Sequence, residues 1–159
     1  MEVLFRQYAL VVERRETLFS YCDSLQPNHF IENLESFGGR SIRYLMVHTA
    51  STYHFWLGHF AALDKKALSS DDKYNNVKQV RTLYGGVNDL TDRFLKQTGT
   101  DIEKPLVNRI PGRDFELSLT PLQLFTHLIT HEYHHKGQVL SMSRQLGYIP
   151  IDTDIIRFD

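Results

Sequence analysis

The sequence of 159 residues predicts an all-α protein: a four-helix bundle with a small β-hairpin before its last helix. Three observations lead to this prediction. Four long segments carry apolar residues at the three- and four-residue spacing of an amphipathic helix. Polar or glycine-containing segments separate them. Just before the fourth, apolar and polar residues alternate beside a Pro-Gly pair, which is typical of a hairpin. Four helices of this length pack as a bundle.

The first two helices are predicted from their apolar stripes and their ends. The first spans residues 2–24 and ends before Pro27. A short turn or partial helix follows, up to the glycine pair at 38–39. Ser41 has the side chain of a helix N-cap, and the second helix runs from there to about Leu63.

The third helix is predicted from about Asp72 to Gln97, after the polar connection of residues 64–73. Gly85 and Gly86 lie in its middle, where each glycine costs up to about 1 kcal/mol of helix stability. The pair therefore predicts a kink or a close contact with another helix.

The hairpin and the fourth helix follow. The hairpin falls within residues 100–119, around Pro111-Gly112. Thr120 then serves as N-cap with Pro121 at the first helical position, and the helix runs to about Leu146. The tail after it, to residue 159, is predicted to be irregular and to pack back on the bundle.

Composition narrows the class of protein. Hydrophobic residues make up 42% and charged residues 23%, which fits one globular domain over residues 1–159. The net charge of −1 argues against a nucleic-acid surface. The sequence contains no run of about 18 apolar residues, so it predicts no membrane span. The N-terminus has no signal-peptide pattern. With a single cysteine, Cys22, which we interpret as a small buried residue, the sequence predicts a soluble cytoplasmic protein.

Histidine is the most informative residue type, with eight in the chain. His127, His131 and His135 follow one another at four-residue steps on the fourth helix, with His134 beside them. Imidazole is a common ligand for zinc and similar ions, and two imidazoles four residues apart on a helix can share one ion. The spacing does not choose between the 127/131 and 131/135 pairs.

The second helix can supply a third ligand. His48 lies beside its apolar stripe, at a depth comparable to that of His131, and we favour it, although spacing alone leaves His54 open. Three protein ligands would leave an open position on the ion, as in catalytic sites.

The same residues spell H-E-x-x-H, the pattern of zinc peptidases, in which the glutamate activates a metal-bound water. Glu132 could fill that role. The extended form of the pattern needs a glycine at 138 and a histidine at 141, where this chain has Gln138 and Ser141. The sequence therefore argues against a peptidase.

Several motifs occur together along the chain. They are His127, the run His131-x3-His135-Lys136-Gly137-Gln138, Arg144-Gln145-Leu146-Gly147, Ser41-Ile42-Arg43 followed by His48 and Trp56, and the tail Asp152-x-Asp154 with Ile155-Ile156-Arg157-Phe158. Together they resemble the DinB family, with its DinB/YfiT-like bundle. The resemblance covers essentially the whole chain and is most specific at the C-terminal motif.

The resemblance implies a bundle that is often dimeric and holds a divalent metal with three histidines, which match His48, His131 and His135. His127 and His134 then become groups that orient a ligand or bind water. The match of Glu132 to the peptidase pattern looks accidental. Gly137 suggests close helix packing, and Gln138 has no assigned physical role.

Other side chains could contribute to a binding site. Tyr53 and Trp56 could line a pocket, although core packing explains them as well. A carboxylate-bearing thiol could be bound by Arg43, Lys136 and Arg144, although a solvated face is the simpler interpretation.

Some relatives in the DinB family are thiol S-transferases that use bacillithiol, mycothiol or glutathione-like thiols. The first hypothesis is therefore a transferase that uses Zn²⁺ or Ni²⁺, a low-molecular-weight thiol and a small electrophilic substrate, in a homodimer. A metal-dependent hydrolase is the second. A non-enzymatic metal-binding protein of a stress response is the third, and it predicts a closed coordination site.

Overall fold

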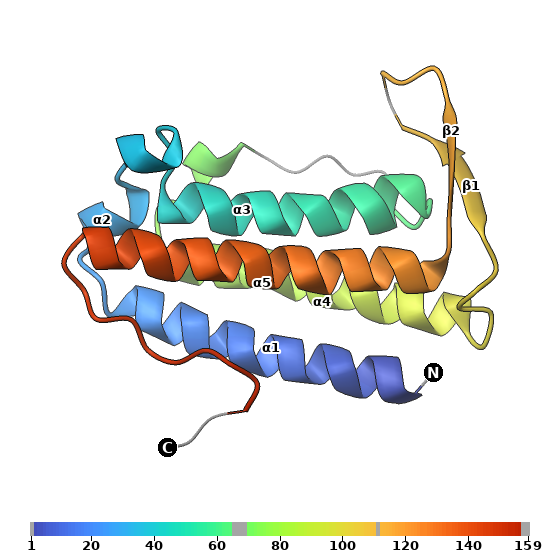
Figure 1. Cartoon of the computed structure of the whole chain (residues 1–159), viewed down its shortest axis with the longest axis horizontal. Helices are drawn as coiled ribbons and strands as arrows, with labels where there is room; N and C mark the ends of the chain where they lie inside the picture. Colours follow the sequence, from blue (N-terminus) through green and yellow to red (C-terminus); the bar gives the residue numbers. More distant parts are fainter. Residues whose placement is uncertain (1, 65–69, 111, 157–159) are drawn as a thin grey trace.

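Four long helices lie side by side in the computed structural model, which describes residues 2–64, 70–110 and 112–156 (Figure 1). The predicted bundle and hairpin are both confirmed. The long helices are α1 (Glu2–Asp23), α3 (Ile42–Tyr53), α4 (Val77–Thr98) and α5 (Pro121–Gln145). Short helical turns connect them: α2 (Pro27–Ile31) and two 3-10 turns at Glu35–Phe37 and Asp71–Lys73. The core lies between the long helices, around side chains such as Phe19, Leu45, Leu90 and Leu124.

Two of the helices begin at the predicted caps. The Ser41 hydroxyl accepts a hydrogen bond from the Tyr44 backbone N–H at the start of α3. At α5, Thr120 and Gln123 form a reciprocal capping box, with Pro121 in the first turn. These contacts satisfy N–H groups that a helix leaves unpaired at its N-terminus, so the two boundaries follow from local chemistry.

The second helix does not stay α-helical to Leu63. It changes at its C-terminal end into a π-helical segment, His54–Phe60. Gly58 lies in this segment, and a Cβ there would collide with the backbone carbonyl of Asp64. The close return of the chain over Gly58 therefore requires glycine.

The third helix begins later than predicted. Asn76 is its N-cap and accepts a hydrogen bond from the Gln79 backbone N–H, whereas Asp72 lies in a separate 3-10 turn. The predicted close contact at Gly85 and Gly86 is also wrong. Both glycines are exposed, α4 runs through them as one α-helix, and no neighbouring atom lies within 4 Å of the position of an added Cβ. Residues 65–69 of the predicted connection lie outside the described residues.

The hairpin projects beyond one end of the bundle (Figure 1). Strands β1 (Leu106–Arg109) and β2 (Glu116–Leu119) are antiparallel, with Leu106 opposite Leu119. Alternate side chains are half-buried, so one face of this ribbon packs on the bundle. Of its predicted turn, Pro111 lies outside the described residues.

The C-terminal tail returns along the bundle, as predicted, for the part up to residue 156 (Figure 1). The Tyr148 hydroxyl contacts His29 at 2.7 Å, and Thr153 is buried. Arg157 and Phe158 lie outside the described residues. Within the part of the chain that the structure describes, no helix is long and apolar enough to cross a membrane.

Candidate metal centre

Three histidines from two neighbouring helices meet in the bundle. His48 comes from α3, and His131 and His135 come from adjacent turns of α5, which packs against α3. One ring nitrogen of each lies within 4.8 Å of the others. The ring centroid of His48 is 5.3 Å from that of His131 and 4.9 Å from that of His135. The cluster thus contains the 131/135 pair, and it contains His48 and not His54.

The hydrogen bond of His135 fixes which nitrogen faces the cluster. Its Nδ1 lies 2.7 Å from the amide oxygen of Gln138. Because that oxygen only accepts, Nδ1 carries the proton and Nε2 presents a lone pair. Gln138 therefore orients the His135 ring, a contact that the sequence did not reveal and that metal-binding histidines commonly make through their second N–H.

The facing nitrogens have the spacing of two ligands. Nε2 of His131 and Nε2 of His135 are 3.2 Å apart. Two imidazoles on one tetrahedral Zn²⁺, each about 2.0–2.1 Å from the ion, hold their nitrogens roughly 3.3 Å apart. Among the described residues, Nδ1 of His131 is buried without a hydrogen-bond partner. The three side chains therefore fit a divalent ion, and Zn²⁺ or Ni²⁺ suits three imidazoles.

The surroundings keep these imidazoles neutral. Burial and the neighbouring imidazoles, His135 first, lower the pKa of His131 to about 4. Burial and the positive charge of Arg40 lower the pKa of His48. Burial also lowers the pKa of His135, against the effect of its hydrogen bond to Gln138. Protons therefore compete weakly for these nitrogens near neutral pH, which favours metal binding.

Two further histidines lie next to the cluster. The ring of His127 is 5.6 Å from that of His131 and 5.5 Å from that of Trp56. The ring of His134 is 5.0 Å from that of His135. Both side chains are exposed, so they extend the row of imidazoles toward solvent.

Glu132 and Tyr53 lie in a second polar cluster, centred on Arg15 of α1. Arg15 donates from Nε and Nη2 to the two carboxylate oxygens of Glu132, at 2.7 and 2.8 Å. The Tyr53 hydroxyl donates to the same carboxylate at 2.7 Å. Since both oxygens are engaged and buried, Glu132 is poorly placed to activate a water at the histidines.

Arg15 is a residue that the sequence analysis missed. It lies between Val11 and Leu18 on the buried face of α1, at helical spacing. A charged residue inside an apolar stripe is the signal that could have revealed it, since a buried charge needs a partner.

Other predicted roles change once the packing is known. Gly137 is exposed with no atom within 4 Å of an added Cβ, so the expected close helix packing there is wrong. Lys136 is buried, and its Nζ donates to the Thr153 backbone carbonyl at 2.8 Å. Arg43 pairs with Asp71 at 3.3 Å.

Cys22 is buried, and burial raises the pKa of its thiol to about 12, which suits a core residue and not a nucleophile.

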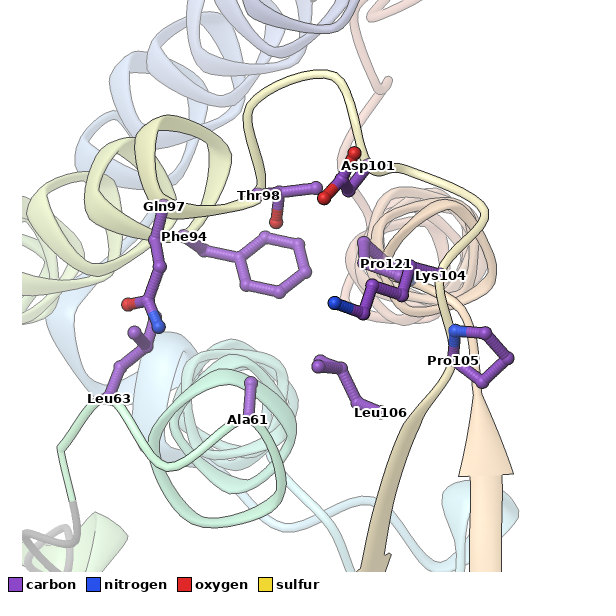
Figure 2. A pocket seen from close by; sticks show the side chains of 10 residues that line it. All are labelled: Ala61, Leu63, Phe94, Gln97, Thr98, Asp101, Lys104, Pro105, Leu106 and Pro121. Atoms are coloured by element: carbon purple, nitrogen blue, oxygen red, sulfur yellow. The ribbon is translucent and has the colours of Figure 1, made fainter.

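Two cavities lie near the hairpin end of the bundle. Figure 2 shows one of about 220 Å³, into which Phe94 of α4 and Lys104 extend. None of the three clustered histidines lines it. The other, of about 290 Å³, includes His127 and Trp56 in its wall and therefore lies beside the histidine cluster.

Comparison with known proteins confirms the family resemblance. The model of the DinB family matches residues 1–159 of the chain. This protein belongs to the DinB family. Among its relatives is the "Uncharacterized protein YizA" of Bacillus subtilis (strain 168), which is 24% identical over 142 residues, or 89% of this chain and 87% of that protein. A DinB-family protein with three converging imidazoles fits metal binding, and His48, His131 and His135 are the residues that would hold the ion.

Proposed function

We propose that this DinB protein is a metal-dependent transferase that joins a low-molecular-weight thiol to a small electrophile. The observation that carries the proposal is the convergence of three neutral imidazoles with a fixed lone pair on His135. Three protein ligands leave coordination positions open. A divalent ion held there would lower the pKa of a bound thiol and supply a sulfur nucleophile near neutral pH.

The protein's own residues have distinct roles in this proposal. His48, His131 and His135 hold the ion, while Gln138 keeps the Nδ1 proton of His135 in place. His127 and His134 stand close enough to orient a substrate or a water. In the transfer, the sulfur forms a bond to the electrophilic carbon, the leaving group departs with its electron pair, and the thiol proton passes to solvent.

The open position separates this proposal from a closed structural site. The exposed side chains of His127 and His134 leave polar groups on the solvent side of the cluster. We also propose a homodimer, by analogy with other members of the family. Analytical ultracentrifugation tests that state independently of activity.

A thiol screen tests the proposed activity. Zinc- or nickel-loaded protein is incubated with 1-chloro-2,4-dinitrobenzene and, in turn, bacillithiol, mycothiol or glutathione, and chloride release is measured. We expect catalysis with at least one thiol, and its loss in His135→Ala. Activity that needs water but no thiol would indicate a hydrolase instead. If the spectrum of cobalt-loaded protein does not change when thiol is added, the ion has no exchangeable position. That result would contradict both the transferase and the hydrolase.

A further inference from the structure

The cavity beside the histidine cluster, here called the Trp56 pocket, has a mainly apolar wall. Its wall is formed by Trp56, Leu117, Leu119, Gln123, Leu124 and His127. These residues come from three separate parts of the fold: the π-helical segment, strand β2 and the first two turns of α5. The hairpin therefore completes the pocket, which gives this small ribbon a use beyond connecting α4 to α5.

The size of the pocket fits a small group. Its volume is about 290 Å³. A cavity of about 150 Å³ lined by apolar side chains can take up benzene, whereas pockets for whole drug-sized ligands begin at about 300 Å³. The Trp56 pocket thus accommodates one substituted ring or a short branched alkyl group.

The chemistry of the wall selects an uncharged occupant. Four of the six side chains are apolar, and none is Lys, Arg, Asp or Glu. Trp56, Leu117 and Leu119 are only half-buried, so they keep apolar surface in contact with solvent. Covering that surface with an apolar group removes it from water, which is favourable. Polar thiols such as glutathione gain little there, so the apolar part of the electrophile is the better match.

The position of the pocket relates it to the histidines. His127 borders the pocket, and its ring lies between those of Trp56 and His131, 5.5 and 5.6 Å away. His127 precedes His131 by one turn of α5, which corresponds to about 6 Å along the helix. A molecule that fills the pocket with one end can therefore reach the histidine cluster with the other.

We propose that the Trp56 pocket binds an uncharged aromatic or short branched alkyl group of the electrophilic substrate and holds its reactive atom toward His131. This inference rests on the proposed function for the identity of the occupant. The pocket itself requires neither metal nor thiol, so its binding can be measured separately.

The only tryptophan of the chain reports on this pocket. Nitrobenzene, an uncharged aromatic quencher, is titrated into metal-free protein while Trp56 fluorescence intensity and lifetime are recorded. We expect saturable quenching with an unchanged lifetime for the fraction that still emits, because a ring held against Trp56 quenches it statically. Quenching that rises linearly without saturation, together with a shortened lifetime, would overturn the proposal.

Two substitutions on the hairpin provide the comparison. Leu117→Asp puts a charge into the wall and should weaken nitrobenzene binding at least tenfold. Val107→Asp is its matched control, because Val107 is exposed on the same hairpin and is not part of the wall. It should bind as the wild type does. Leu117→Gln, which keeps the approximate size, serves if Leu117→Asp fails to fold by circular dichroism. Equal binding in a folded Leu117 variant and the wild type would refute the assignment.

The metal-loaded protein then separates this inference from the proposed function. With an active thiol, Leu117→Gln should raise KM for 1-chloro-2,4-dinitrobenzene at least fivefold and leave KM for iodoacetamide, which has no ring, unchanged. If no thiol supports transfer but nitrobenzene still saturates at Trp56, the transferase proposal fails and the pocket stands. If transfer occurs and the two KM values respond alike, the pocket assignment fails and the transferase stands.

Discussion

Two polar clusters lie on neighbouring faces of α5, and they differ in how their polar atoms are partnered. In the first, Arg15, Glu132 and Tyr53 meet through hydrogen bonds of 2.7–2.8 Å. In the second, two histidine nitrogens face each other at 3.2 Å, and Nδ1 of His131 is buried without a partner within the described residues. The first cluster is complete from the protein alone, whereas the facing Nε2 atoms of the second cluster offer the spacing that a cation would need. We therefore propose that the adjacent residues His131 and Glu132 serve metal binding and structure respectively.

The largest effect is expected when the cluster of Arg15, Glu132 and Tyr53 is broken. Arg15→Met leaves the Glu132 carboxylate buried without its cation, which should cost about 3–5 kcal/mol of unfolding free energy in urea denaturation. The matched control is Arg81→Ala, which removes a more exposed cation paired with Glu16 and Asp23 and should cost about 1 kcal/mol or less.

A double variant distinguishes the ion pair from the packing of Arg15. Arg15→Met combined with Glu132→Leu removes both charges, so the protein should regain part of the stability lost in Arg15→Met alone. If the losses of unfolding free energy in the two single variants add up in the double variant, the cluster stabilises the protein through side-chain packing and not through the pairing of its charges.

The next largest effect is expected on the Zn²⁺ affinity of the histidine cluster. Gln138→Leu removes the acceptor that holds the Nδ1 proton of His135, so the affinity for Zn²⁺ should fall about 10–100-fold while metal-free stability changes little. Gln138→Glu keeps an oxygen at the same place and should retain most of the affinity. Competition with a chromogenic chelator measures both, and wild-type affinity in Gln138→Leu would disprove the role of Gln138.

The two clusters should also respond differently to acid. Burial and neighbouring imidazoles lower the pKa of His131 to about 4, from an ordinary value of 6.5. Above pH 6.5 neither the folded nor the unfolded chain protonates this group. As the pH falls from 6.5 toward 4, the unfolded chain binds the proton first, so His131 destabilises the metal-free protein progressively.

Urea denaturation of metal-free protein at several pH values between 7 and 4 tests this sign. The loss of stability with falling pH should be smaller in His131→Ala than in the wild type. If the stability of His131→Ala and that of the wild type depend on pH in the same way, the folded protein does not lower the pKa of His131.

The smallest effect is expected at a residue of α5 that belongs to neither cluster. Gly137 is exposed and helical, with open space around the position of a Cβ. Gly137→Ala should therefore stabilise the protein by about 0.5–1 kcal/mol and leave Zn²⁺ affinity unchanged. A loss of affinity or of stability would show that the Cα of Gly137 packs closely against a neighbouring residue.

The parts of the fold that local chemistry decides were predictable from the sequence. Ser41 and Thr120 cap their helices through neighbouring N–H groups, and the alternation before Thr120 fixes the hairpin. The start of α4 was predicted at about Asp72, whereas Asn76 caps the helix through the Gln79 N–H. The glycine pair at 85–86 was misinterpreted because a sequence does not show which helix face lacks a neighbour.

The candidate site was predictable in part for the same reason. The four-residue spacing of the histidines on α5 is a local property, and the place of His48 beside an apolar stripe favoured it over His54. The family resemblance then selected the 131/135 pair. The partner of Glu132 is 117 residues away in the sequence, so only the packing of α1 against α5 reveals it. The π-helical segment and the Trp56 pocket also depend on how distant parts of the chain meet.

The central claim is that His48, His131 and His135 form a metal site. Co²⁺ titration of metal-free, untagged protein tests this claim most directly. We expect visible absorption that saturates at one equivalent in the wild type, persists in His59→Ala and is absent in both His48→Ala and His135→Ala. Elemental analysis of the purified wild type should then show about one equivalent of Zn²⁺ or Ni²⁺. Saturation at one equivalent in folded His48→Ala and His135→Ala, or no Co²⁺ spectrum in the wild type, would contradict the claim and leave the histidines as structural residues.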